Sequence, residues 1–219
     1  MRPQRLVYVV LGAILVAVLG VGLLRYRLFP SLLLGDAASR ISLERGGIDV
    51  QARWLLSHLH GSVSDRASWL IASYPTEGDE QRRGLIARAI GLLESEADQA
   101  ESKLIGDRLM EFYREERSQN VRGQILSSFL DMKPRQEVTT LAERVCLDET
   151  ESDYVRVNAL LLVRRSLEGA KLETLLRGLE RSPSEFVSKS ASGILAQLKA
   201  SATAPSEEHQ RRSGQPTGH

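Results

Sequence analysis

The chain has 219 residues, and its 29 lysines and arginines are matched by 28 aspartates and glutamates, which gives a formal net charge of +1 at pH 7. Because basic residues outnumber acidic residues by only one, there is no large positive charge to hold a polyanion, and nucleic acid is disfavoured as a partner. With one cysteine, Cys146, the chain can form neither an intramolecular disulfide nor a cysteine-based zinc site.

An uninterrupted apolar run extends from Leu6 to Leu24, after a short basic tail at residues 1–5. At about 1.5 Å of helical rise per residue, this run nearly matches the roughly 30 Å hydrocarbon layer of a bilayer. We therefore expect a transmembrane helix at 6–24 that contacts the lipid bilayer and makes this a single-pass membrane protein. A cleaved secretory signal is the alternative, although its apolar stretch is usually only about 7 to 15 residues long.

Basic residues flank the apolar run on both sides. Arg2 and Arg5 precede it, which favours a cytoplasmic N-terminus and a C-terminal domain on the non-cytoplasmic side. Arg25 and Arg27 follow it and favour the opposite orientation.

The rest of the chain divides into three segments. Residues 25–48 are expected to form a juxtamembrane linker with a short helix that ends near Gly46 and Gly47. Residues 49–200 contain enough chain for one folded domain. Residues 201–219 are nearly free of apolar side chains and rich in Ser, Thr, Pro, Gly and Gln, so this tail is expected to be disordered.

Apolar residues between 49 and 200 recur at helical spacing. Ala52, Leu55, Leu56 and Leu59, for example, form one apolar stripe at i, i+3, i+4 and i+7. No comparable stretch shows the period-two alternation of a β-hairpin, so the expected fold class is all-α. Helices are expected near 49–60, 62–74, 79–94, 98–116, 120–132, 136–147, 152–167, 171–181 and 184–199.

Capping residues mark several helix starts. In the segment Ser182-Pro183-Ser184-Glu185, Ser182 is the expected N-cap, with proline at the first helical position and glutamate at the third. Ser62 and Thr150, each with an aspartate three residues later, are weaker start signals.

Alternate helices resemble one another. Val121-Arg122, Val155-Arg156 and Val187-Ser188 recur at intervals of about 32 to 34 residues, and Arg83 marks an earlier copy. Each pair is followed by apolar residues at helical spacing, so one helix pair cannot bury its apolar faces alone and successive pairs must stack. The expected repeat positions are Val121, Arg122, Ile125, Phe129, Val155, Arg156, Ala159, Val163, Val187, Ala191 and Leu195.

These residues resemble HEAT repeats, especially the short HEAT-like variety first described in phycobilin lyases. The resemblance covers roughly 79–200 and departs from the pattern at Ser188 and Arg82, which replace an arginine and a valine. It implies a short α-solenoid of helix pairs whose second helices line a concave side. It also implies that Arg122 and Arg156 belong to an inter-repeat ladder with acidic residues. Side chains on the concave side that avoid the core would be Gln124, Ser127, Asn158 and Lys189.

No catalytic, cofactor or metal site is expected. His58 and His60 are two residues apart on an expected helix, so they point to different faces and cannot easily share a metal. Cys146 lies at the edge of an apolar stripe and is expected to be a small buried hydrophobe. The chain lacks a phosphate-binding glycine loop and a Gly-x-Ser-x-Gly elbow.

We therefore expect a membrane-anchored HEAT-like scaffold that binds a protein partner and has no enzymatic activity. One alternative is a lyase-like or chaperone-type solenoid that binds a small ligand, which requires a pocket with convergent polar groups. The other is a nucleic-acid-binding solenoid, which requires basic residues gathered on one face. The sequence does not identify the partner or the oligomeric state.

Overall fold

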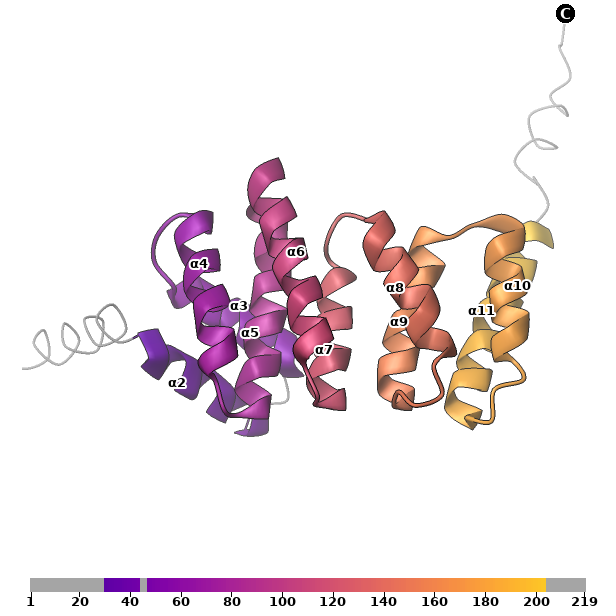
Figure 1. Cartoon of the computed structure of the whole chain (residues 1–219), viewed down its shortest axis with the longest axis horizontal. Helices are drawn as coiled ribbons and strands as arrows, with labels where there is room; N and C mark the ends of the chain where they lie inside the picture. Colours follow the sequence, from indigo (N-terminus) through magenta and orange to yellow (C-terminus); the bar gives the residue numbers. More distant parts are fainter. Residues whose placement is uncertain (1–29, 44–46, 204–219) are drawn as a thin grey trace, which may run out of the picture. The chain divides into compact units, whose positions relative to one another are not determined.

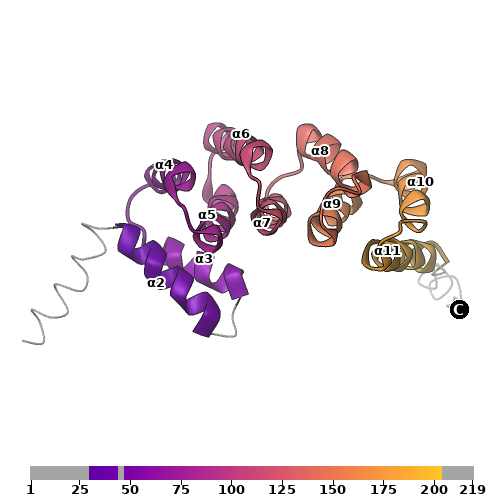
Figure 2. The ribbon, with the colours of Figure 1, turned by 60° about the horizontal axis from the view of Figure 1, so that its bottom comes forward.

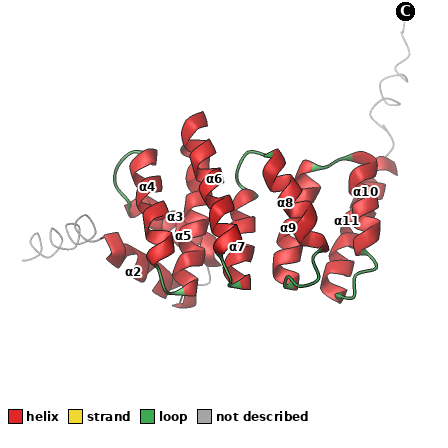
Figure 3. Ribbon diagram, in the orientation of Figure 1, coloured by secondary structure: helices red, strands yellow, loops and turns green. Residues whose placement is uncertain are grey.

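The computed structural model describes residues 30–43 and 47–203, and within these ranges the chain consists of helices joined by loops, with no strand (Figure 1, Figure 3). The all-α prediction is therefore confirmed for the described residues, and most helix ends fall within a few residues of their expected positions. The elements are α2 (Pro30–Leu43), α3 (Gly47–His58), α4 (Val63–Ser73), η1 (Tyr74–Thr76), α5 (Glu80–Leu93), η2 (Glu94–Glu96), α6 (Gln99–Glu115), α7 (Gln119–Phe129), α8 (Gln136–Leu147), α9 (Asp153–Ser166), α10 (Gly169–Leu179) and α11 (Glu185–Thr203).

The expected membrane segment, Leu6 to Leu24, lies outside the described residues, as do the basic tail at 1–5 and most of the C-terminal tail. Among the helices in the described ranges, none has the length and hydropathy needed to cross a bilayer.

The chain divides after Lys133 into two compact units. Unit 1 contains α2 to α7, and unit 2 contains α8 to α11. The sequence had suggested one continuous domain at 49–200. The division falls between α7 and α8, although the repeat spacing does not change there.

Capping side chains explain where the helices begin. Ser62 and Asp98 each form a capping box, at the starts of α4 and α6 respectively. At α11 the expected cap was wrong, because the Oγ of Ser184, not that of Ser182, accepts a hydrogen bond from the Val187 amide. The same kind of correction applies to α9, which is capped by Ser152 and not by Thr150.

Helix α5 is the centre of unit 1. Every residue from 84 to 93 is buried, because α5 packs against α3, α4, α6 and α7. Figure 2 shows α4 and α6 on one side of α5, with α2 and α3 on the other. Leu33 and Ala37 of α2 are fully buried, so the segment expected to be a linker contributes to this core.

The backbones of α5 and α7 approach each other closely. A Cβ atom placed on Gly91 would lie 2.6 Å from the Cβ of Ser128, so this crossing has no room for a side chain on α5. The Ser128 hydroxyl donates a 3.0 Å hydrogen bond to the Ala87 carbonyl of α5. Gly91 and the buried Ser128 thus determine how closely α5 and α7, the second helices of two successive helix pairs, pack against each other.

Unit 2 consists of two helix pairs, α8 with α9 and α10 with α11. Helix α9 packs against both α8 and α11, and Figure 2 shows α8 and α10 in one layer with α9 and α11 in the other. Val155, Val163 and Val187 have no exposed surface and lie in the core between these layers.

Candidate protein-binding surface

The structure buries all of the apolar repeat positions. None is more than 5% exposed; they are Val121, Ile125, Phe129, Val155, Ala159, Val163, Val187, Ala191 and Leu195. The residues that the repeat pattern brings together are therefore core residues, and a surface that binds a partner must be sought elsewhere on the same helices.

The polar repeat position fastens each second helix to the end of the helix before it. Arg83 donates to the Glu77 carbonyl, Arg122 to the Glu116 carbonyl and Arg156 to the Cys146 carbonyl. In the last copy the Ser188 hydroxyl donates a 2.7 Å hydrogen bond to the Glu180 carbonyl. Serine thus performs, over a shorter reach, the same backbone contact as the arginines.

The same side chains make further contacts that differ between copies. Arg83 forms a 2.9 Å ion pair with Glu116 of the next turn. Arg122 donates to the Tyr113 hydroxyl and lies 4.3 Å above the centre of its ring. Arg156 donates to the Ser182 hydroxyl. Arg83 thus has an acidic partner in the next turn, and hydroxyl groups are among the contacts of Arg122 and Arg156.

Glu116 is the centre of a buried polar cluster in unit 1. Its side chain is only 6% exposed and accepts hydrogen bonds from Arg83, from the Tyr74 hydroxyl at 2.8 Å and from the Ser118 amide. Burial opposes ionisation of Glu116, but these hydrogen bonds outweigh it and hold its pKa below the ordinary value. Burial and the hydrogen bond to Glu116 raise the pKa of Tyr74 well above 10.0.

A second buried charge, Arg88, was not singled out by the sequence analysis. Its side chain is 5% exposed and bridges Asp49 of α3 and Asp131, which follows α7, while also donating to the Ser127 carbonyl. The hydrogen bond from Arg88 lowers the pKa of Asp49. The available signal was an arginine flanked by Ala87 and Ala89 in an otherwise apolar stretch, because a charge in a core requires partners.

Neither cluster has the arrangement of a catalytic or metal site. Each carboxylate is engaged by an arginine or by backbone amides, which is typical of groups that hold elements together. Among the described residues, no set of three His, Cys, Asp or Glu side chains is grouped to hold a metal ion. His58 instead stacks on Trp54, with ring centroids 4.3 Å apart. Cys146 is fully buried, and burial raises the pKa of its thiol to about 12, which makes it a poor nucleophile.

The four side chains expected to contact a partner are not equivalent. Gln124 and Ser127 of unit 1 are half-buried, and Lys189 of unit 2 is exposed, with a 2.6 Å ion pair to Glu185. The prediction for Asn158 was wrong, because it is only 9% exposed. Its amide donates to the Tyr154 carbonyl one turn earlier, at the edge of the buried arc of α9.

A different set of side chains on the second helices of unit 2 is exposed. Tyr154 and Leu161 of α9 are 41% and 37% exposed, Phe186 of α11 is 59% exposed, and Val157 is half-buried between Tyr154 and Leu161 on α9. Tyr154, Val157 and Leu161 follow one stripe of α9 at i, i+3 and i+7. We call these four residues the α9–α11 face.

Repeat register could have identified part of the α9–α11 face. Tyr154 and Phe186 each precede a repeat valine, at the position that Asn120 occupies in α7. Because the valine points into the core, the residue before it is turned about 100° away around the helix, toward its edge. An aromatic side chain there in two successive copies is therefore a signal of an exposed aromatic pair.

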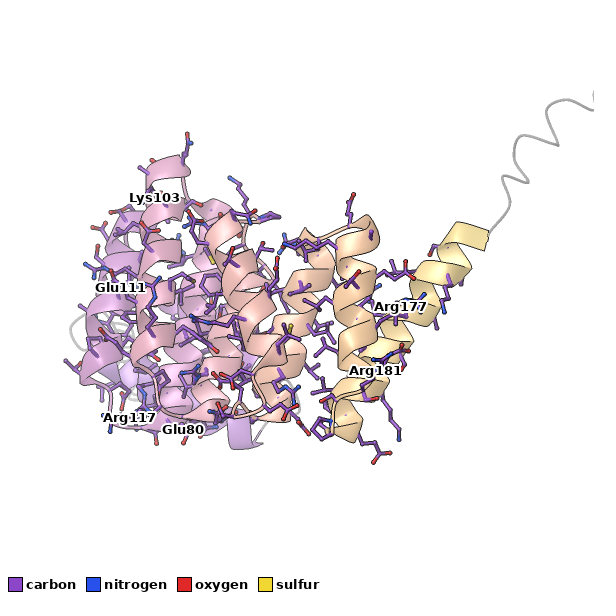
Figure 4. The ribbon with its side chains drawn as sticks, turned by 45° about the vertical axis from the view of Figure 1, so that its right-hand side comes forward. Glu80, Lys103, Glu111, Arg117, Arg177 and Arg181 are labelled. Atoms are coloured by element: carbon purple, nitrogen blue, oxygen red, sulfur yellow. The ribbon has the colours of Figure 1, made fainter. Side chains whose placement is uncertain are left out.

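The first helices of the pairs carry a different surface. Lys103 pairs with Asp107 and Arg108 with Glu111 on the outside of α6. On α10, Arg177 pairs with Glu173, and Figure 4 shows Lys103, Glu111 and Arg177 extending from the outer sides of their helices. Exposed ion pairs of this kind are typical of a solvated face.

Two hollows accompany these surfaces. A cavity of about 560 Å³ in unit 2 is lined by Leu147, Ala170, Lys171, Thr174, Leu175 and Gly178. Its polar groups are already engaged, because the Lys171 amine pairs with Glu143 and the Thr174 hydroxyl donates to the Ala170 carbonyl. A smaller hollow of about 260 Å³ in unit 1 is crossed by the ion pair of Arg66 with Glu96. The larger cavity lacks the convergent polar groups that a small-ligand site requires. The smaller hollow is lined mainly by polar side chains, and of these Arg66, Glu96, Ser57 and Ser95 have partners within the chain.

Comparison of the chain with models of protein families, with curated proteins and with solved structures gave no significant match. The surface chemistry described above is therefore the basis for assigning a function.

Proposed function

We propose that this chain is a membrane-anchored, HEAT-like α-solenoid scaffold that binds a protein partner through the exposed side of its second helices. The observation that carries the proposal is the α9–α11 face, where Tyr154, Leu161 and Phe186 are exposed on neighbouring helices. Aromatic residues are enriched in the centres of protein interfaces, and clusters of exposed apolar residues mark interaction sites.

The contrast between the two layers supports this assignment. From Tyr154 to Leu161, α9 exposes no charged side chain, whereas α6 and α10 expose several charged side chains on their outer sides. Charged residues are depleted from interface cores, so the second helices have the better surface for a partner. The apolar segment Leu6 to Leu24 supports membrane attachment, on sequence grounds alone.

Site-specific photo-crosslinking in native membranes tests the proposal. A photoreactive phenylalanine analogue would replace Phe186 in the full-length chain, and crosslinked proteins would be separated and identified. We expect a discrete protein adduct at this position, because the side chain is 59% exposed and lies on the α9–α11 face.

Leu147 provides a matched control. It is an exposed apolar residue of the same unit, 54% exposed, but it ends α8 in the other layer. The analogue at Leu147 should give no adduct, or a different one. Equal adducts at both positions, or none at Phe186, would contradict the proposed surface.

A further inference from the structure

In unit 1, the second helix α5 is covered by another helix of the same chain, α3. Helix α3 packs on α5, on the side that faces away from α4 and α6 (Figure 2). It is amphipathic, with Ala52, Leu55 and Leu56 buried and its acidic Asp49 held by Arg88. The helix that packs on α5 thus has an apolar stripe and one carboxylate paired with an arginine.

The repeat register relates this covered side of α5 to α9. Arg83 of α5 and Arg156 of α9 make the same contact with the preceding turn, so they occupy equivalent positions. Gly84 and Arg88, which meet Ile48 and Asp49 of α3, are then equivalent to Val157 and Leu161. Two residues of the α9–α11 face, Val157 and Leu161, are therefore the counterparts in unit 2 of residues that contact both α3 and α7 in unit 1.

The substitutions between the two helices change the chemistry of that surface. Where α5 has a glycine and an arginine, α9 has Val157 and Leu161, so the seat in unit 2 is more apolar. Within unit 2, α9 packs against α8 and α11, which leaves Leu161 37% exposed. An aliphatic seat of this kind fits the apolar stripe of a helix.

Acidic and basic side chains lie at opposite ends of the exposed stripe of α9. Asp153 is exposed at the start of α9, and Arg164 and Arg165 are exposed at its end. A helix lying along α9 gains from carboxylates near the two arginines, just as Asp49 of α3 meets Arg88.

From the internal example and the charge pattern, we infer that the α9–α11 face takes an amphipathic α-helix of a partner protein, with aliphatic residues along one stripe and acidic residues at the end that meets Arg164 and Arg165. This inference rests on the proposed function and specifies the class of partner element.

Peptide display on the purified full-length chain tests it. A library of random linear peptides of about four helical turns, on the order of 15 residues, would be enriched for binding to the chain. We expect the enriched peptides to have aliphatic residues at i, i+3, i+4 and i+7 with Asp or Glu near one end, and to lose binding when a central residue is replaced by proline.

Three variants locate the binding site. Leu161→Glu and the double variant Arg164→Glu with Arg165→Glu should each weaken the enriched peptides by about tenfold or more. Leu147→Glu, at an exposed apolar position in the other layer of unit 2, should leave their affinity unchanged. Circular dichroism of all three proteins verifies that the helices are retained.

The outcomes separate this inference from the proposed function. Extended or basic peptides that still depend on Leu161 would overturn the helical, acidic partner and leave the protein-binding surface in place. Peptides that bind the Leu161→Glu protein as well as the original chain, or a library without any Leu161-dependent binder, would overturn both.

Discussion

At the scale of single residues, the buried polar groups of unit 1 form paired clusters that link helices. Glu116 is the clearest case, since a carboxylate that is only 6% exposed must be compensated by its partners. Arg83, Tyr74 and two backbone amides supply those partners from three segments of the chain. Loss of the charge would therefore loosen the turn between α6 and α7 from α5.

Replacing Glu116 by glutamine is expected to destabilise the protein by about 1.5 to 3 kcal/mol at pH 7, the range for hydrogen bonds to a charged group. The folded-state pKa of Glu116 lies below its ordinary value of 4.5, so its stabilising effect is complete above pH 4.5 and is lost as the pH falls through the folded-state pKa. The free-energy difference between the two proteins should consequently shrink in acid. Urea unfolding at pH 7 and near pH 3.5 measures it.

Glu111→Gln is the control for this experiment. Glu111 lies on the exposed side of α6 and is 47% exposed in its pair with Arg108. A surface pair of this kind contributes at most about 1 kcal/mol. If Glu116→Gln is no more destabilising than this control, or if its effect is the same at both pH values, the buried cluster does not stabilise unit 1 through the Glu116 charge.

At the scale of elements, the close crossing of α5 and α7 is the most demanding contact of unit 1. The first heavy atom of any side chain at Gly91 would lie 2.6 Å from Ser128 Cβ and 3.0 Å from its backbone. Because the obstruction includes backbone, it cannot be relieved by rotating one side chain. Helix α7 would have to move, which would also strain the hydrogen bond from Ser128 to Ala87.

Gly91→Ala is therefore expected to cost about 1 to 3 kcal/mol of unfolding free energy, the usual penalty for overpacking a core. Gly178→Ala is the matched control, because no atom lies within 4 Å of its added Cβ and alanine favours a helix by up to about 1 kcal/mol. Chemical unfolding followed by circular dichroism compares the two. A Gly91→Ala protein as stable as the Gly178→Ala protein would show that the helices are not in close contact.

The extent of most helices was predictable from the sequence because apolar spacing and capping residues are local signals. The caps at Ser62 and Asp98 follow from residues within one turn. The burial of Arg88 was not predictable in this way, since its partners Asp49 and Asp131 are remote in sequence and are brought together only when α3 and α7 pack on α5.

The candidate surface was harder to predict than the helices. The repeat pattern predicts which residues point into the core. It does not predict how much of the circumference of a helix is buried. In α9 the buried set includes Asn158 and Leu160 beside the repeat positions, so the expected exposure of Asn158 was wrong. Asn158 lies directly beside the exposed stripe through Tyr154 and Leu161, at the edge of the buried arc.

At the scale of the whole molecule, the repeat pattern and the compact units do not coincide. The spacing between Val121 and Val155 resembles that between Val155 and Val187, yet the chain divides after Lys133 in the first interval and not in the second. Both intervals contain a proline between helices, Pro134 in the first and Pro183 in the second. Neither the repeat period nor the position of proline therefore explains the boundary.

The proposed membrane anchor at Leu6 to Leu24 leads to a prediction of the side of the membrane on which the units lie, and the single cysteine of the chain allows a direct test. Cys146 is fully buried, and burial raises the pKa of its thiol to about 12, so the native protein should not react with a maleimide unless it is unfolded. Thr140→Cys would place a second thiol on an exposed position of α8. Because the basic tail ahead of Leu6 favours a translocated C-terminal domain, we expect a membrane-impermeant maleimide to label this variant in intact cells or spheroplasts.

The unmodified chain, with Cys146 alone, should stay unlabelled in the same cells and react only in denaturant. Labelling of the Thr140→Cys protein only after lysis would place the units in the cytoplasm and make Arg25 and Arg27 the dominant orientation signal.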